Sequence, residues 1–133
     1  MERILGQYSP YLYAVMRIMV GFLFACHGAQ KLFGLLGGFG PSGGPAPLFS
    51  LMGLAGAIEF LGGLCIMLGW WTGSVAFIAS GMMAAAYFMA HYPASFWPIL
   101  NDGEPAVLFC FSFLYMASVG SGVWSIDRAF GKS

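Results

Sequence analysis

The stretch YLYAVMRIMVGFLFACHGAQKLF, residues 11–33, decides the fold of this chain. It is a nearly continuous apolar run, and an α-helix needs about 20 such residues to cross the hydrocarbon core of a bilayer. Its only charged residues are Arg17 and Lys31, and the run is too long for the core of a signal peptide. We therefore expect a membrane-spanning helix that is retained in the protein.

Three further apolar runs follow, at residues 48–68, 71–91 and 106–124. The segment GGFGPSGGPAP, residues 37–47, separates the first two runs and is too rich in glycine and proline to hold a helix. The second and third runs are so close in sequence that they must form an antiparallel hairpin. We predict an all-α fold with a single domain, residues 1–133: an integral membrane bundle of four antiparallel helices.

The composition agrees with a lipid-facing exterior. Hydrophobic residues make up 59% of the chain and charged residues only 8%, whereas soluble domains carry about 25% charged residues. The formal net charge of zero argues against a nucleic-acid partner, because no basic surface is available to neutralise phosphates. Three cysteines lie in apolar runs without a Cys-x-x-Cys pair, so we expect them to pack between helices.

The few charged residues predict an orientation. Arg3, Arg128 and Lys132 lie near the two ends of the chain, whereas the last loop carries Asp102 and Glu104. Four spans place both ends on one side, and positive residues favour the cytoplasm. We expect both termini to be cytoplasmic.

Small residues recur at helical spacing in two of the predicted spans. Such stripes let two helix backbones approach closely inside a membrane, so we expect them to serve packing. They are Gly21, Ala25 and Ala29 in the first span and Ala76, Ser80 and Ala84 in the third.

Several ionisable residues lie inside or at the ends of these spans. Inserting one Arg, Lys or Asp costs about 2.5–3.5 kcal/mol, so each requires a partner or a role. Arg17, His27 and Lys31 fall on one narrow stripe of the first helix, and Glu59 lies near the middle of the second. We expect a buried Arg17–Glu59 pair and one polar pocket near the outer face. The candidate ligand-binding residues are Arg17, His27, Lys31, Glu59, His91 and Glu104.

Two interpretations of this set remain open. In the first, the Arg17–Glu59 pair is an internal staple, and the other charged side chains reach water at the membrane surface. In the second, the pocket binds a small polar or redox-active head group that enters from the lipid. The helical rise puts His27 and His91 roughly 6 Å apart in depth, which disfavours haem, and we expect no metal site. No catalytic residue can be assigned.

Several short motifs, taken in order, resemble the DoxX-like family of small membrane proteins. After Arg17 and Gly21 they are HGAQKL at 27–32, EFLGG at 59–63, LGWWT at 68–72, HYP at 91–93, FWP at 96–98, NDGE at 101–104 and GSGVWSID at 120–127. The resemblance implies a four-helix, multi-pass protein of the bacterial or archaeal cytoplasmic membrane. Such relatives include the membrane subunit of a thiosulfate:quinone oxidoreductase and proteins associated with redox-defence enzymes, and many members have no assigned activity.

The leading hypothesis is a quinone-associated subunit or anchor of a membrane redox system, which acts as an enzyme only as part of a quinone-linked oxidoreductase. It predicts a quinone as the ligand and no covalently bound cofactor. The predicted partners are the lipid bilayer and either a larger membrane complex or further copies of the chain in a homo-oligomer. The alternatives are a non-catalytic scaffold or assembly subunit, and a small-solute conduit along the Arg17–Glu59 line.

Overall fold

The computed structural model describes residues 1–132, which fold into helices joined by turns and loops. Two short N-terminal elements, α1 and the 3-10 helix η1, precede the long helix α2, and α4 continues into a single π-helical turn, η2. The elements are α1 (Glu2–Leu5), η1 (Gly6–Tyr8), α2 (Ser9–Phe33), α3 (Leu51–Leu68), α4 (Thr72–Ala86), η2 (Tyr87–His91), α5 (Glu104–Val119) and α6 (Ile126–Ala129). The predicted all-α bundle is confirmed.

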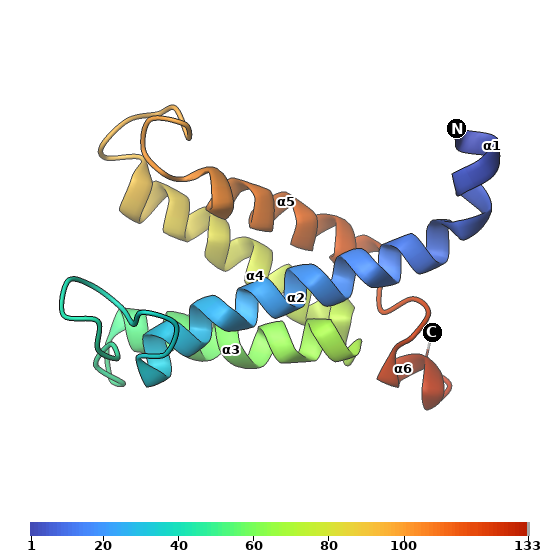
Figure 1. Cartoon of the computed structure of the whole chain (residues 1–133), viewed down its shortest axis with the longest axis horizontal. Coiled ribbons are helices and arrows are strands. Elements are labelled where there is room, and N and C mark those ends of the chain that lie inside the picture. The colour runs from blue at the N-terminus through green and yellow to red at the C-terminus, as the bar shows by residue number, and fades with distance from the viewer. Residues whose placement is uncertain (133) are drawn as a thin grey trace.

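The four long helices form two antiparallel pairs, α2 with α3 and α4 with α5 (Figure 1). Both ends of the chain lie at one end of the bundle, which we call the terminal end. The loops 34–50 and 92–103 lie at the opposite end, the loop end, and the two pairs spread apart toward it (Figure 1). This divergence leaves room for side chains of all four helices to meet near the loop end.

Glycines set the register between α2 and α3. A methyl group on Gly28 would lie 2.2 Å from the backbone nitrogen of Phe60, and one on Gly63 would lie 2.5 Å from that of Ala25. At the other end of the pair, a methyl group on Gly21 would lie 2.6 Å from the nitrogen of Met67. The backbones therefore touch, as expected for small residues between membrane helices.

Within residues 1–132, three helical segments are long and apolar enough to cross a membrane: Glu2–Phe33, Leu51–Leu68 and Thr72–His91. The fourth, α5, is also apolar but has only 16 residues, which corresponds to about 24 Å at a rise of about 1.5 Å per residue. The predicted span 106–124 is thus shorter at its C-terminal end, because the helix ends at Val119 and Gly120 adopts a φ of +82°.

The centre of the bundle is a fully apolar cluster where the two pairs meet. Phe24 of α2 contacts Phe113 of α5 edge-on, with ring centroids 4.6 Å apart, and both side chains are buried. Ile66 of α3, Ala76 of α4 and Met116 of α5 complete the cluster. This core lies directly beside the cavity described next, since Phe24 takes part in both.

Candidate functional site

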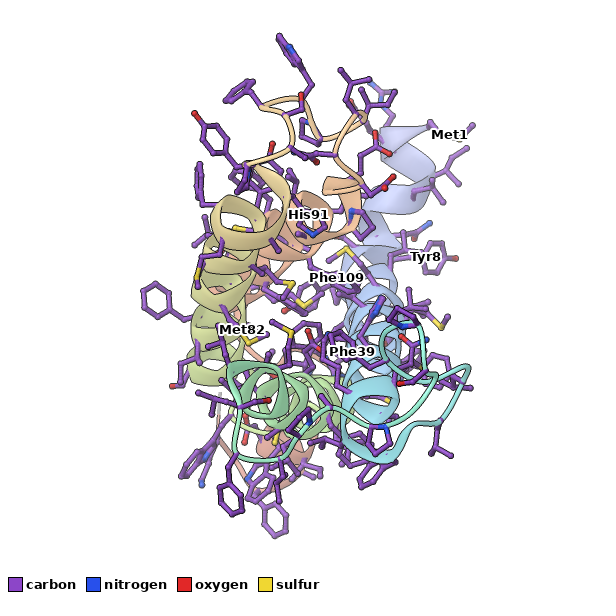
Figure 2. All side chains as sticks on the ribbon, turned by 90° about the vertical axis from the view of Figure 1, so that its left-hand side faces the viewer. Met1, Tyr8, Phe39, Met82, His91 and Phe109 are labelled. Atoms are coloured by element: carbon purple, nitrogen blue, oxygen red, sulfur yellow. The ribbon has the colours of Figure 1, made fainter. Side chains whose placement is uncertain are left out.

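A cavity of about 210 Å³ lies between the two helix pairs, on the loop-end side of the core. Its walls come from α2, α3, α4, η2 and α5 and are mainly methionine, alanine and phenylalanine side chains. Figure 2 looks into the bundle from the loop end, with His91 and Phe109 between the ribbons of α2 and α4. The polar residues that line the cavity are His27, Lys31, Glu59 and His91.

Lys31 and Glu59 form an ion pair across α2 and α3. The Lys31 ammonium donates to both carboxylate oxygens of Glu59, at 2.8 Å and 2.5 Å. The Glu59 side chain is 5% exposed and that of Lys31 is 17% exposed, so the pair is largely shielded. Gly56, one turn before Glu59, makes room for the lysine stem, because a methyl group there would lie 2.8 Å from its Cβ.

The predicted Arg17–Glu59 pair is wrong, because the register between α2 and α3 puts the two residues at different levels. Gly28 packs against Phe60, so Glu59 lies level with the C-terminal part of α2. Lys31 follows Arg17 by 14 positions, which is about 21 Å along a helix. The prediction assumed that the centres of the two spans coincide, and they do not.

Arg17 is instead fully buried near the terminal end, where it binds backbone carbonyl groups. Its Nη1 donates to the oxygens of Ile66 and Met67, both at 2.7 Å, in the last turn of α3. Its Nη2 donates to Trp124 O at 2.7 Å and Val123 O at 3.3 Å. The guanidinium thus ties the C-terminal segment to the end of α3, and Arg17 takes no part in the cavity.

The hydrogen bond of His91 fixes which ring nitrogen carries a proton. Nδ1 lies 2.9 Å from the backbone oxygen of Asn101, and a carbonyl can only accept. Nδ1 must therefore be the donor, which makes Nε2 of the neutral ring an acceptor. The ring also stacks on Tyr87, one turn earlier in η2, with centroids 6.3 Å apart. Single π-turns such as η2 occur frequently at functional sites.

The remaining two predicted residues, His27 and Glu104, differ in their position relative to the cavity. His27 packs edge-on against Phe109, with centroids 5.8 Å apart, and remains exposed beside the cavity. Glu104 is the exposed first residue of α5, and it is the following residues, Pro105 and Ala106, that reach the cavity wall. The structure therefore brings together four of the six predicted residues and leaves Arg17 and Glu104 apart from them.

Two polar residues that organise the ends of the bundle were not among the candidates. At the loop end, the buried Asn101 amide donates to Ser95 O at 2.6 Å, and its oxygen accepts from the Gly103 nitrogen at 2.8 Å. At the terminal end, the buried Asp127 carboxylate accepts from the backbone nitrogen of Trp71 at 2.8 Å. Asn101 and Asp127 lie within the motifs NDGE and GSGVWSID quoted above. Their position in these motifs was the sequence signal that could have identified them.

Comparisons with known proteins identify a family for this chain. The sequence profile of the DoxX family matches residues 12–92, which include all four polar residues of the cavity. A Haemophilus influenzae protein, described as an uncharacterized protein, is 38% identical over 135 residues, covering 96% of this chain and 97% of the relative. No solved structure matches the chain significantly. A profile that spans more than half of the chain, together with this full-length relative, establishes that the protein belongs to the DoxX family.

Proposed function

We propose that the cavity binds the ring of a quinone drawn from the bilayer, and that the chain is a quinone-associated subunit or anchor of a membrane redox system. The observation that carries the proposal is the grouping of the Lys31–Glu59 pair with His27 and His91 on one otherwise apolar cavity. Ligand sites of this kind combine apolar walls with a few polar groups that orient the ligand.

The size of the cavity supports a ring rather than a larger ligand. An engineered apolar cavity of about 150 Å³ binds benzene, so about 210 Å³ leaves room for one substituted ring. Phe24 and Phe109 supply aromatic walls for such a ring. An isoprenoid tail would extend into lipid between the diverging helix pairs.

The polar groups of the cavity suit the oxygens of a quinone and its quinol. The Lys31 ammonium is a donor for a carbonyl oxygen, and Glu59 balances its charge. Nε2 of neutral His91 can accept a hydroxyl proton, and His27 offers a second imidazole at the exposed side. Reduction of a quinone also requires two electrons, which in this proposal a partner protein exchanges with the bound ring.

Binding measurements test the proposal. The purified protein in lipid nanodiscs is titrated with short-tail ubiquinone and menaquinone analogues, and we expect saturable binding with preference for the single-ring compound. Combining His27→Ala with Lys31→Ala should weaken this binding at least tenfold. A paired Lys31→Met, Glu59→Gln variant should weaken it as well, without leaving an unpaired buried charge.

The matched control is Glu104→Gln, a loop-end carboxylate outside the cavity wall, which should bind like the native protein. Unchanged affinity in the His27→Ala, Lys31→Ala double variant would exclude the cavity as the quinone site.

For the location we propose a multi-pass protein of the bacterial cytoplasmic membrane, with the terminal end in the cytoplasm. Arg3, Arg128 and Lys132 belong to the terminal end, and Asp102 and Glu104 belong to the loop end. Positively charged residues favour the cytoplasmic side. A C-terminal green fluorescent protein fusion should fluoresce, and a C-terminal alkaline phosphatase fusion should be inactive. The reverse pattern would refute this orientation.

A further inference from the structure

The loop 92–103 exposes large apolar side chains to its surroundings. Phe96 is 61% exposed, Trp97 62%, Ile99 74% and Leu100 70%. No charged residue occurs between His91 and Asp102. Contiguous exposed apolar side chains of this kind mark a surface that contacts a membrane or another protein.

The loop is an ordered structure that holds these side chains outward. The Asn101 side chain bonds two backbone groups of the loop, and the nitrogen of Leu100 donates to Trp97 O at 2.9 Å. The Tyr87 hydroxyl donates to Phe96 O. Irregular backbone is tolerated at membrane depth where its polar groups find partners within the protein, and these bonds supply several of them.

One of these hydrogen bonds joins the loop to the last turn of a segment that is long enough to span a membrane. Tyr87 opens η2, and Thr72–His91 as a whole has 20 residues, or about 30 Å of helix, which equals the thickness of the hydrocarbon core. Because the Tyr87 hydroxyl bonds Phe96 O, this part of the loop is held against the end of η2. The loop leads directly into the partner helix α5, which begins at Glu104.

A second cavity, of about 300 Å³, lies beneath the loop between α4 and α5. Its lining is apolar and comes partly from the loop itself, through Phe96 and Pro98, and partly from Phe88, Val107 and Phe111 of the helices. Phe88 and Phe111 are also exposed on the outer, lipid-facing side of these helices. The apolar surface of the loop is thus continuous with helix faces that face acyl chains.

We propose that the loop 92–103 is seated in the bilayer, with its apolar side chains in the boundary between head groups and acyl chains. Its partner is therefore lipid and not a soluble protein. Three independent features support this choice: the uncharged exposed side chains, the hydrogen bond that holds the loop against the last turn of an apolar span, and the apolar cavity that continues onto the helix surface. This inference does not depend on the identity of the ligand in the first cavity.

Site-directed spin labelling in liposomes tests the proposal. A nitroxide is attached through Ile99→Cys or Leu100→Cys in a background in which the three native cysteines are replaced by alanine. Ile78→Cys, on an exposed face of α4, is the lipid control, and Glu2→Cys, on exposed α1, is the aqueous control. We expect the ratio of oxygen to nickel-chelate collision rates at positions 99 and 100 to approach that at position 78. A ratio equal to that at position 2 would overturn the proposal and leave the loop free for a soluble partner.

Tryptophan quenching provides a second measurement that keeps the native cysteines. The emission of Trp97 is obtained as the difference between the native protein and Trp97→Phe. This component should be quenched by phospholipids brominated on their acyl chains and protected from aqueous acrylamide. Quenching by acrylamide alone would refute the membrane seating of the loop.

Discussion

The role of Arg17 can be tested by removing its guanidinium while keeping an apolar stem, as in Arg17→Met. Three of its hydrogen bonds, to Ile66, Met67 and Trp124, are 2.7 Å long, and the residue is 0% exposed. A hydrogen bond from a charged donor contributes about 1.5–3 kcal/mol, so three of them contribute at least about 4.5 kcal/mol. Desolvation of the guanidinium offsets part of this, and we expect a net loss of about 3–5 kcal/mol of unfolding free energy.

Arg17→Lys should lose less unfolding free energy than Arg17→Met, because an ammonium keeps a charged hydrogen-bond donor. It should still be less stable than the native protein, because it lacks the planar fork that reaches α3 and the C-terminal segment together. Unfolding in detergent micelles titrated with denaturing detergent measures both variants. Limited proteolysis should show earlier cleavage in residues 120–132 of Arg17→Met, because the segment bound through Trp124 is released.

The same variants separate a structural role from a ligand-binding one. Since Arg17 does not line the cavity, Arg17→Lys should bind quinone analogues with native affinity under conditions where it is folded. Native stability of Arg17→Met would refute the reasoning about the carbonyl bonds. Loss of quinone binding by folded Arg17→Lys would restore Arg17 to the ligand site.

Three further predictions concern the packing and the polar groups. Glu59→Ala should destabilise the protein by about 3–5 kcal/mol, and more than Lys31→Met combined with Glu59→Leu, because the single change leaves a shielded ammonium unpaired; equal melting temperatures of the two variants would contradict this. Gly28→Ala should destabilise by about 1–3 kcal/mol because its methyl group would meet the backbone of α3, whereas Gly81→Ala, with open space around it, should be neutral or stabilising in the same thermal melts. Asp127→Ala should destabilise by about 1–3 kcal/mol through loss of the acceptor for the Trp71 nitrogen, and its C-terminal segment should exchange amide hydrogens faster than in the native protein; native exchange there would argue against the contact.

The fold was predictable because glycine, proline and apolar runs report directly on helix position. The predicted spans 11–33 and 71–91 agree closely with α2 and with α4 plus η2. The second span was predicted to begin at residue 48, but Ser50 caps α3 by accepting from the Gly53 nitrogen, so the helix begins at Leu51. The cap was present in the sequence as a serine before an apolar run.

The partner of Glu59 was not predictable from helical periodicity alone. Periodicity assigns a residue to a face of its own helix, and it carries no information about the axial offset between two helices. That offset is set by backbone contacts such as Gly28 with Phe60 and Gly21 with Met67. A different choice of contacting glycines moves Glu59 along α2 from the level of Lys31 toward that of Arg17. The helix face predicted for Glu59 was therefore correct, but its predicted level along α2 was wrong.

The two ends of the bundle differ in whether their polar atoms are free to bind a ligand. An ionisable residue inside a membrane is by default a candidate for function. At Arg17, however, both terminal nitrogens are committed to backbone carbonyls in a fully buried position, so a ligand has no access to them. At the loop end, Nε2 of His91 and the exposed ring of His27 remain available on a cavity wall. Access to a cavity, and not charge alone, is what makes the loop end the place where this protein binds a ligand in our proposal.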